Sequence, residues 1–378
     1  MDALLAGNQR VPGAKGGHKV IEKFGPLRGE KLQILDENGQ ARPDLEPKLE
    51  GPDLRRIYSL MVTTRAADLK ALKLQRQGRM GTFAPSLGHE ACQVGSAFAL
   101  EKKDWVFPYF RDLGMYLTLG LPLKNYYLYW MGNEEGMRIP PDLNIFTMAV
   151  PVGSQLPHAV GCALAAKIKK EKAAVLAYFG DGATSEGDFN EALNFAGVLR
   201  TPNVFICFNN QYAISTPVSR QTAAKTIAQK ALAFGFAGII VDGNDVLAMY
   251  AATKEALDKA RAGGEPTLIE AFTYRMGNHT TSDDASRYRA EDEVREWAKK
   301  DPLERFKLYL KNKGLWDESF ENQVQKEAEE VINDAIEKAE NTPPPSLDDL
   351  FIYTFKEMPA DLTEELGNLR AFAKEGQK

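Results

Sequence analysis

Cysteine is scarce in this sequence, with 3 cysteines among 378 residues: Cys92, Cys162 and Cys207. No two of them form a CxxC pair, and each lies among apolar or small neighbours. So few scattered thiols do not build a disulfide framework or a zinc site, and they suit a reducing compartment. We therefore expect all three cysteines to be buried structural residues.

The sequence also lacks a long apolar run and a dominant charge. No segment approaches the roughly 20 apolar residues of a membrane span, and the N-terminus does not resemble a secretory signal. The 47 basic and 52 acidic residues give a net charge of −5, without a basic stripe. Neither a membrane nor a nucleic acid is expected as a partner, and the cytoplasm is the expected location.

The apolar pattern predicts an α/β fold. Short apolar runs that are typical of buried strands alternate with longer stretches of helical periodicity, which predicts a mostly parallel sheet flanked by helices. Strands are predicted at 173–179, 204–208, 238–241 and 267–272. Helices are predicted at 52–77, 88–100, 154–170, 185–198, 246–262 and 291–340, with Ser185, or else Thr184, as the cap of the helix at 185–198.

Three segments are predicted along the chain. Residues 1–30 are rich in Gly, Lys and Pro and are expected to form a flexible arm. Residues 31–290 hold the alternating pattern and are expected to form the α/β domain. Residues 291–378 are expected to form a helical C-terminal extension, interrupted by prolines at 343–345.

The most informative stretch is Gly180-Asp181-Gly182, directly after the predicted strand at 173–179. Glycines let an anionic group approach the backbone, and a following helix can direct its N–H groups at that anion. Asn210 ends the next predicted strand, 210 − 181 = 29 residues later. Carboxylate and amide oxygens are hard ligands that suit magnesium, and ligands bind beyond the carboxyl ends of parallel strands. A lone GDG is a common turn, whereas the order strand–GDG–helix–strand–NN is far more specific.

Of the four histidines, His279 is the best candidate for proton transfer. It lies in a polar loop after the predicted strand at 267–272, and imidazole titrates near neutral pH. On its residues alone, an ordinary surface histidine is the favoured interpretation of His279. His18 lies in the expected arm, while His89 and His158 are interpreted as structural.

The GDG…NN order closely resembles the thiamine-diphosphate motif. The longer run GDGATSEGDFNEALNFAG…FNNQYAISTPV resembles the α subunit of the decarboxylating component of 2-oxo acid dehydrogenase complexes, of the pyruvate or branched-chain type. The resemblance covers about residues 30 to 365 and includes RQGRMGTFAPSLGHEA, FPYFRD, QTAAKTIAQKA, VDGNDV and the loop at 275–289. It implies the thiamine-diphosphate-binding fold.

The resemblance implies roles for ten residues. Asp181 and Asn210 match magnesium ligands, and Tyr212 matches a residue that offers its backbone carbonyl to the metal. Gly182 and Ala183 match backbone donors to the diphosphate.

The other five implied residues surround the same cofactor. Arg111 matches a diphosphate-binding arginine, which suits bidentate recognition. Phe110 stands where relatives often have tyrosine, so a hydroxyl contact to the diphosphate is lost at that position. Val150 and Val152 match backbone contacts to the aminopyrimidine, although their side chains alone would suit a core. His279 matches the catalytic histidine that acts near the cofactor and the lipoyl acceptor.

The resemblance further implies a reaction and partners. The reaction is oxidative decarboxylation of a 2-oxo acid, pyruvate being favoured, with acyl transfer to the lipoyl group of a dihydrolipoyl acyltransferase. A branched-chain dehydrogenase, an acetoin-cleaving or transketolase-like thiamine enzyme, and a non-enzymatic binding module are the alternatives. Since only one GDG…NN unit is present, a separate β chain is expected, in an α₂β₂ heterotetramer.

Overall fold

The computed structural model describes residues 19–375. Most of the predicted arm at 1–30, with His18, therefore lies outside the described residues, and the first helix is α2 (Lys19–Lys23). Within residues 19–375, no helix is both long enough and apolar enough to cross a membrane.

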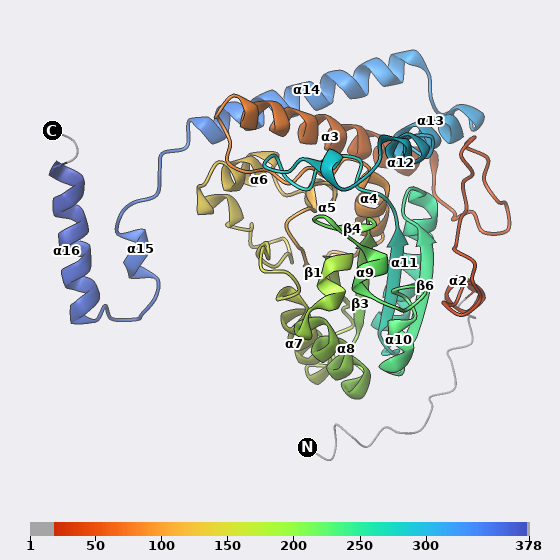
Figure 1. The fold of residues 1–378 in the computed structure, drawn as a ribbon, viewed down its shortest axis with the longest axis horizontal. Helices are drawn as coiled ribbons and strands as arrows, with labels where there is room; N and C mark the ends of the chain where they lie inside the picture. The colour runs from red at the N-terminus through yellow and green to blue at the C-terminus, as the bar shows by residue number, and fades with distance from the viewer. Residues whose placement is uncertain (1–18, 376–378) are drawn as a thin grey trace.

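The centre of the molecule is a parallel sheet of five strands (Figure 1). Its strands, in spatial order, are β1 (Trp105–Phe107), β2 (Val175–Gly180), β3 (Asn203–Asn209), β7 (Thr267–Phe272) and β6 (Ala237–Asp242). Every neighbouring pair is parallel, so all five carboxyl ends lie at one edge. The predicted α/β class with a mostly parallel sheet is confirmed.

The sheet is buried on both faces, which explains its continuous apolar runs. Leu176 and Tyr178 of β2 face one core, and Ala177 and Phe179 face the other, because successive side chains of a strand point to opposite sides. The first face carries α3 (Gly51–Arg76), α4 (Glu90–Phe98) and α11 (Val246–Arg261). The second carries α7 (Gln155–Ile168), α8 (Gly187–Leu199) and α10 (Lys230–Ala233).

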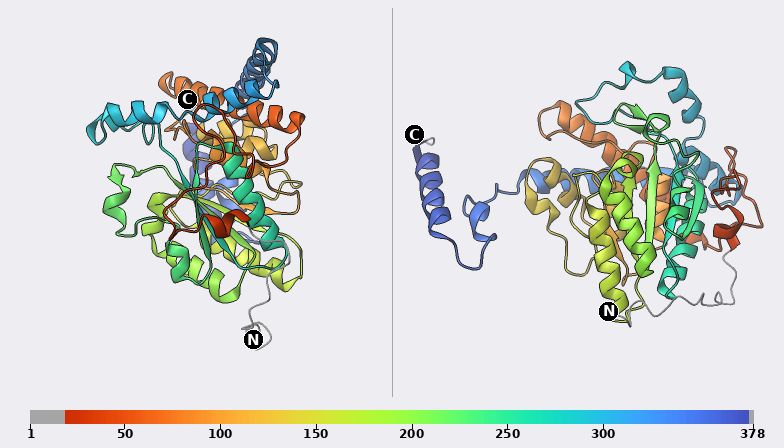
Figure 2. Two further views of the ribbon diagram at one scale, coloured as in Figure 1. Left: turned by 90° about the vertical axis from the view of Figure 1, so that its right-hand side faces the viewer. Right: turned by 60° about the horizontal axis from the view of Figure 1, so that its bottom comes forward.

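The remaining elements frame the sheet and extend the chain. Along the chain, seven short elements lie between β1 and β7: α5 (Leu113–Leu119), α6 (Leu123–Trp130), η1 (Glu134–Met137), η2 (Asp181–Ser185), β4 (Tyr212–Ala213), β5 (Thr216–Pro217) and α9 (Val218–Gln221). The short helix η3 (Ala285–Arg287) follows β7. The last helices are α12 (Glu291–Ala298), α13 (Pro302–Asn312), α14 (Glu318–Glu340), α15 (Asp349–Ile352) and α16 (Ala360–Glu375). Helix α14 lies along α3, whereas α15 and α16 stand away from the body (Figure 2).

Two local expectations differ from the structure. The prediction that Ser185 or Thr184 caps the following helix is wrong, because residues 181–185 form the 3-10 helix η2 and α8 begins only at Gly187 with Glu186 as its cap. The Ser185 hydroxyl instead donates to Gln221 (3.4 Å). Strand β1 was not predicted, since three residues are too few to show a periodicity.

Close packing of α8 makes Gly197 a sensitive position. A methyl group at Gly197 would overlap the Phe234 carbonyl oxygen, which is backbone and cannot rotate away. We expect Gly197→Ala to lower the free energy of unfolding by about 1–3 kcal/mol. Gly161 on α7 is the matched control, because its added methyl group meets nothing within 4 Å; alanine there should stabilise the helix by up to about 1 kcal/mol. Urea unfolding of both variants measures the difference, and equal stabilities would contradict this packing.

Candidate active site

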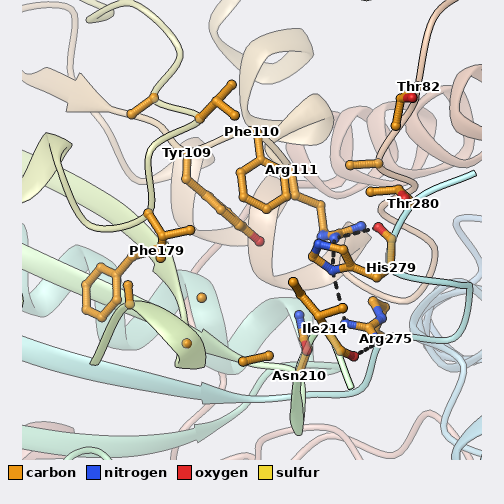
Figure 3. A pocket seen from close by; sticks show the side chains of 18 of the residues that line it. Thr82, Tyr109, Phe110, Arg111, Phe179, Asn210, Ile214, Arg275, His279 and Thr280 are labelled. Atoms are coloured by element: carbon orange, nitrogen blue, oxygen red, sulfur yellow. Dashed lines mark hydrogen bonds between the residues drawn. The ribbon is translucent and has the colours of Figure 1, made fainter. Parts of the chain in front are cut away.

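A cavity of about 720 Å³ lies at the carboxyl edge of the sheet. Four strands that are neighbours in the sheet deliver its polar residues: β1 is followed by Arg111, β2 by Asp181, β3 by Asn210 and β7 by Arg275. These residues are far apart in the sequence, yet they meet because parallel strands end at one edge (Figure 3). This is the position that an α/β sheet offers to a ligand.

The acidic side of the cavity is built around Asp181. Its side chain is 2% exposed, and burial raises the pKa of its carboxyl group. Gln221 Nε2 donates to Asp181 Oδ2 (2.8 Å) and is the largest influence that lowers this pKa. Asn210, also buried, accepts a hydrogen bond from the Tyr212 backbone N–H (3.3 Å). A carboxylate and an amide oxygen thus line one small region of the cavity.

The glycine after Asp181 is required by close packing. A Cβ atom at Gly182 would approach the Ala213 Cβ to 2.9 Å, closer than side chains pack. The turn therefore keeps its backbone open toward the cavity, where Gly182 and Ala183 both line the wall. Backbone N–H groups in such a turn can approach an anion closely.

Two buried arginines supply positive charge to the same cavity. Arg111 and Arg275 are each 1% exposed, and neither forms an ion pair with a carboxylate of the described residues. Arg111 donates to the carbonyl oxygens of Pro85 and of His279 (2.9 Å for the latter). Arg275 donates to the carbonyl oxygens of Tyr212 (3.0 Å) and Ile214 (2.7 Å), and its Nε has no partner. Buried guanidinium groups that contact mainly carbonyl oxygens favour an anionic ligand.

The carboxyl groups of Asp68 and Asp112, which lie near Arg111, do not neutralise the positive charge of the two arginines. Burial raises the pKa of Asp68 to about 7 and raises that of Asp112 well above its ordinary value. Carboxyl groups that are easily protonated compensate a cation poorly. The cavity therefore keeps a positive side, at Arg111 and Arg275, opposite Asp181.

His279 lies between the two arginines. The contacts that they make with its ring define which ring nitrogen carries the proton. Its Nδ1 is 3.2 Å from Arg111 Nη2 and 3.4 Å from Arg275 Nη1. Guanidinium groups only donate, so Nδ1 accepts and the proton of the neutral ring is on Nε2. Burial, followed by Arg111 and Arg275, lowers the His279 pKa to about 3. The imidazole is thus neutral at physiological pH, with an N–H group at Nε2.

A local network holds the loop that carries His279. Asp283 Oδ2 accepts hydrogen bonds from the His279 backbone N–H (2.7 Å) and from the Tyr288 hydroxyl (2.5 Å). Arg289 donates to the carbonyl oxygens of Met276 and Gly277 (2.9 Å each). These contacts hold the loop at the cavity and orient the histidine.

All ten residues that the sequence predicted for the site line this one cavity: Phe110, Arg111, Val150, Val152, Asp181, Gly182, Ala183, Asn210, Tyr212 and His279. Val150 and Val152 are each 49% exposed, so their side chains do not belong to a core. The Tyr212 carbonyl oxygen already accepts from Arg275, which leaves its second lone pair for a metal.

Sequence reasoning missed three polar residues of this region. Arg275 was recognised only as part of the loop, although its place three residues after β7 is a usable signal. Tyr109 also lines the cavity, but it follows a strand that was not predicted. Gln221 reaches Asp181 from α9, 40 residues away, and no sequence pattern indicates this contact.

The other histidines and the cysteines lie elsewhere. His89 is fully buried beside Phe208 at the start of α4, and His158 contacts the Ser154 carbonyl (2.8 Å) on α7. Neither lines the cavity. All three cysteines are free; Cys92 and Cys207 are buried as expected, and Cys162 is only half-buried.

The donor set fits a magnesium–diphosphate group. Among the described residues, no cluster of three or more His, Cys, Asp or Glu side chains could hold a metal alone. Asp181, Asn210 and a carbonyl oxygen can supply part of an octahedral shell, while ligand oxygens would supply the rest. Two buried, incompletely paired arginines match the negative charge that such a ligand brings.

The chain also matches a known protein family over most of its length. The family model described as "Dehydrogenase E1 component" matches residues 58–348. The chain is 46% identical over 338 residues to "Pyruvate dehydrogenase E1 component subunit alpha" of Staphylococcus aureus strain Mu50, covering 89% of this chain and 91% of that protein. It is 48% identical over 333 residues to the protein of the same name from Acholeplasma laidlawii, covering 87% and 96%.

A relative that is named for a different substrate is similar to this chain to nearly the same degree. The chain is 46% identical over 346 residues to "3-methyl-2-oxobutanoate dehydrogenase subunit alpha" of Mycobacterium tuberculosis, covering 87% of this chain and 94% of that protein. The resemblance predicted from the motifs is thus confirmed across most of the chain. The chain belongs to the dehydrogenase E1 component family.

Proposed function

We propose that this chain is the thiamine-diphosphate-binding α subunit of a 2-oxo acid dehydrogenase. The enzyme decarboxylates a 2-oxo acid oxidatively and passes the acyl group to a lipoyl group. One observation carries the proposal: Arg111 and Arg275 are buried without an ion-pair partner among the described residues and line one cavity together with Asp181 and Asn210. Membership of the dehydrogenase E1 component family supports it.

In this proposal each predicted residue has a defined task. Asp181, Asn210 and the Tyr212 carbonyl oxygen bind Mg²⁺, since all three offer hard oxygen ligands. Arg111 and the backbone N–H groups of Gly182 and Ala183 bind the diphosphate.

The aminopyrimidine ring of the cofactor would lie against the cavity wall at Val150 and Val152, and Phe110 would lie beside the diphosphate. When bound, thiamine diphosphate supplies the electron sink that makes decarboxylation possible, while the protein positions the reactants and excludes water.

His279 is proposed as a catalytic hydrogen-bond donor. Its neutral ring holds a proton on Nε2, and Arg111 and Arg275 contact the ring through Nδ1. Nε2 can donate a hydrogen bond to a reacting atom of the substrate, while the low pKa of the ring keeps another positive charge from being placed between the two arginines. Phe110, whose ring centre is 6.1 Å from that of His279, limits the directions in which the ring can turn.

The exposed surface near the cavity supports the proposal of a β chain. Val150, Val152 and Ile214 line the cavity and are each about half exposed, so this part of the cavity wall is apolar and accessible. On α8, Phe195 and Val198 are also exposed. Apolar side chains grouped in this way mark a surface that another protein covers. We therefore propose an α₂β₂ heterotetramer that acts with a lipoyl-bearing dihydrolipoyl acyltransferase.

Pyruvate is the proposed substrate, and a branched-chain 2-oxo acid is the alternative. The sequence runs FPYFRD and QTAAKTIAQKA, which resemble the pyruvate type, support this choice. The similarity to the Mycobacterium tuberculosis relative supports the alternative. An apolar pocket discriminates by only about 1–3 kcal/mol for each methylene, so some activity with both acids is expected. Acetoin cleavage is a less favoured third candidate.

The proposed function is tested on the chain co-expressed with its β chain. We expect lipoamide-dependent decarboxylation that requires Mg²⁺ and thiamine diphosphate, with a higher kcat/KM for pyruvate than for 2-oxoisovalerate. The chain alone should be inactive, because half of the cofactor environment is missing. A higher kcat/KM for 2-oxoisovalerate would select the branched-chain alternative, and full turnover by the isolated chain would contradict the need for a β chain.

Removing either proposed metal ligand should weaken Mg²⁺-dependent cofactor binding. We expect Asp181→Ala and Asn210→Ala each to weaken it by at least the roughly 10–100-fold that the loss of an outer-shell partner costs. Asn190→Ala is the control, because Asn190 is exposed on α8 and contacts only the Glu186 carbonyl oxygen. Calorimetric titration with thiamine diphosphate at several Mg²⁺ concentrations measures the effect. If both variants bind thiamine diphosphate as tightly as the wild type does, the assignment of Asp181 and Asn210 as metal ligands is wrong.

Replacing His279 should separate binding from catalysis. We expect His279→Ala to bind thiamine diphosphate nearly as well as the wild type but to transfer acyl groups to lipoamide about 10²–10³-fold more slowly, the usual cost of removing one positioned hydrogen-bond donor. His158→Ala, at an exposed histidine of α7, is the matched control and should keep full activity. Full acyl transfer by the His279 variant would refute the catalytic role.

A further inference from the structure

Gln221 contacts the buried carboxylate of Asp181 from outside the cavity. Its Nε2 donates to Asp181 Oδ2 over 2.8 Å, and no other side chain of the described residues donates to this carboxylate. Asp181 is 2% exposed and lines the cavity, whereas Gln221 is half-buried and is not part of the cavity wall. Any influence that Gln221 has on a ligand in the cavity therefore passes through Asp181.

The hydrogen bonds of Gln221 define which end of its amide faces Asp181. The same Nε2 also donates to the Thr216 carbonyl oxygen (3.3 Å), and the Ser185 hydroxyl group donates to Gln221 Oε1 (3.4 Å). A carboxylate and a carbonyl oxygen only accept hydrogen bonds, so the atom that contacts both must be the amide nitrogen with its two N–H groups. The amide is thus held at both ends and presents a donor to Asp181.

These contacts join the two chain segments that carry proposed metal ligands. Asp181 and Ser185 are the first and last residues of η2, which follows β2. Tyr212 begins β4, which pairs with β5 in an antiparallel hairpin, and α9 follows β5 directly and ends at Gln221. The hairpin therefore returns the chain to η2, against which α9 packs. Gln221 thereby ties the segment of Asp181 to the segment of Tyr212.

A carboxylate that binds a metal needs a defined direction. The last side-chain torsion of an aspartate is broad, so the carboxylate of Asp181 turns unless a partner holds it. An ionised carboxylate has about four lone-pair sites, so one donor restricts its rotation and leaves sites for a metal. A neutral amide gives this restraint without a positive charge that would repel Mg²⁺. Glutamine is therefore better suited to this place than lysine or arginine.

We propose that Gln221 is a positioning residue of the magnesium site and holds the Asp181 carboxylate in the orientation that binds Mg²⁺. The inference rests on the proposed function, because it takes Asp181 as a metal ligand. Hydrogen-bond partners of metal ligands typically contribute about 10–100-fold to metal affinity. Gln221 should accordingly influence how tightly the metal binds and leave the reaction of the fully loaded enzyme unchanged.

The test removes the amide donor and keeps the size of the side chain. Gln221→Met retains the length of glutamine but cannot donate to Asp181. Gln323→Met is the matched control, because Gln323 Nε2 donates to Glu327 Oε1 over the same 2.8 Å on the exposed surface of α14. The control therefore loses the same kind of hydrogen bond outside the site.

Both variants and the wild type are co-expressed with the β chain. Calorimetric titration with Mg²⁺ in the presence of excess thiamine diphosphate gives the Kd of the metal. Thermal unfolding without Mg²⁺ or thiamine diphosphate gives the Tm of the empty protein, and kcat for pyruvate is measured at saturating Mg²⁺.

We expect Gln221→Met to raise the Kd of Mg²⁺ by about 10–100-fold. Its kcat at saturating Mg²⁺ should equal that of the wild type, because excess metal overcomes the weaker site. The Tm of the empty protein should stay within about 4 °C of the wild type, the shift that the loss of a single hydrogen bond produces. Gln323→Met should bind Mg²⁺ as the wild type does.

Two results would overturn the inference. An unchanged Kd of Mg²⁺ in Gln221→Met would show that Asp181 needs no partner. A weaker Mg²⁺ affinity together with a larger fall in the Tm of the empty protein would show that Gln221 acts on the whole fold. A wild-type protein that binds neither Mg²⁺ nor thiamine diphosphate would instead refute the proposed function, and the inference with it.

Discussion

Two buried guanidinium groups that converge on one histidine are the constraint on which the site depends. Arg111 and Arg275 are held by backbone carbonyl oxygens and by His279 Nδ1, and neither has an ion-pair partner among the described residues. Burying such charges costs free energy, which the fold must supply elsewhere. A dianionic ligand bound to these groups would offset much of that cost.

The parallel sheet is what makes this arrangement possible. Its strand order brings the ends of β1, β2, β3 and β7 together, although the residues that follow them are spread over more than 160 positions, from Arg111 to Arg275. The same edge carries Asp181, so positive and negative groups line one cavity. In this account, the fold contributes position and electrostatics, and the reactive group comes from the cofactor.

Long apolar runs in the sequence predicted β2, β3 and β7, and the resemblance to a known family implied ten site residues, all of which line one cavity. The glycine turn at 180–182 indicated the side of the cavity at which we propose that the diphosphate binds. The cap at Ser185 was wrong because a 3-10 turn precedes α8, which no propensity distinguishes from a first helical turn. The contact of Gln221 with Asp181 could not be predicted, since it is a tertiary contact. The place of Tyr109 at the cavity could not be predicted either, because the strand before it has only three residues.

The most direct test of the central claim compares thiamine with thiamine diphosphate as stabilising ligands. Thermal unfolding of the chain with its β chain is followed with each compound at equal concentration, with and without Mg²⁺. If the buried arginines and Asp181 hold a magnesium–diphosphate group, thiamine diphosphate with Mg²⁺ should raise the Tm and thiamine should not. Equal stabilisation by both compounds, or none by either, would contradict the claim that this cavity is built for a diphosphate.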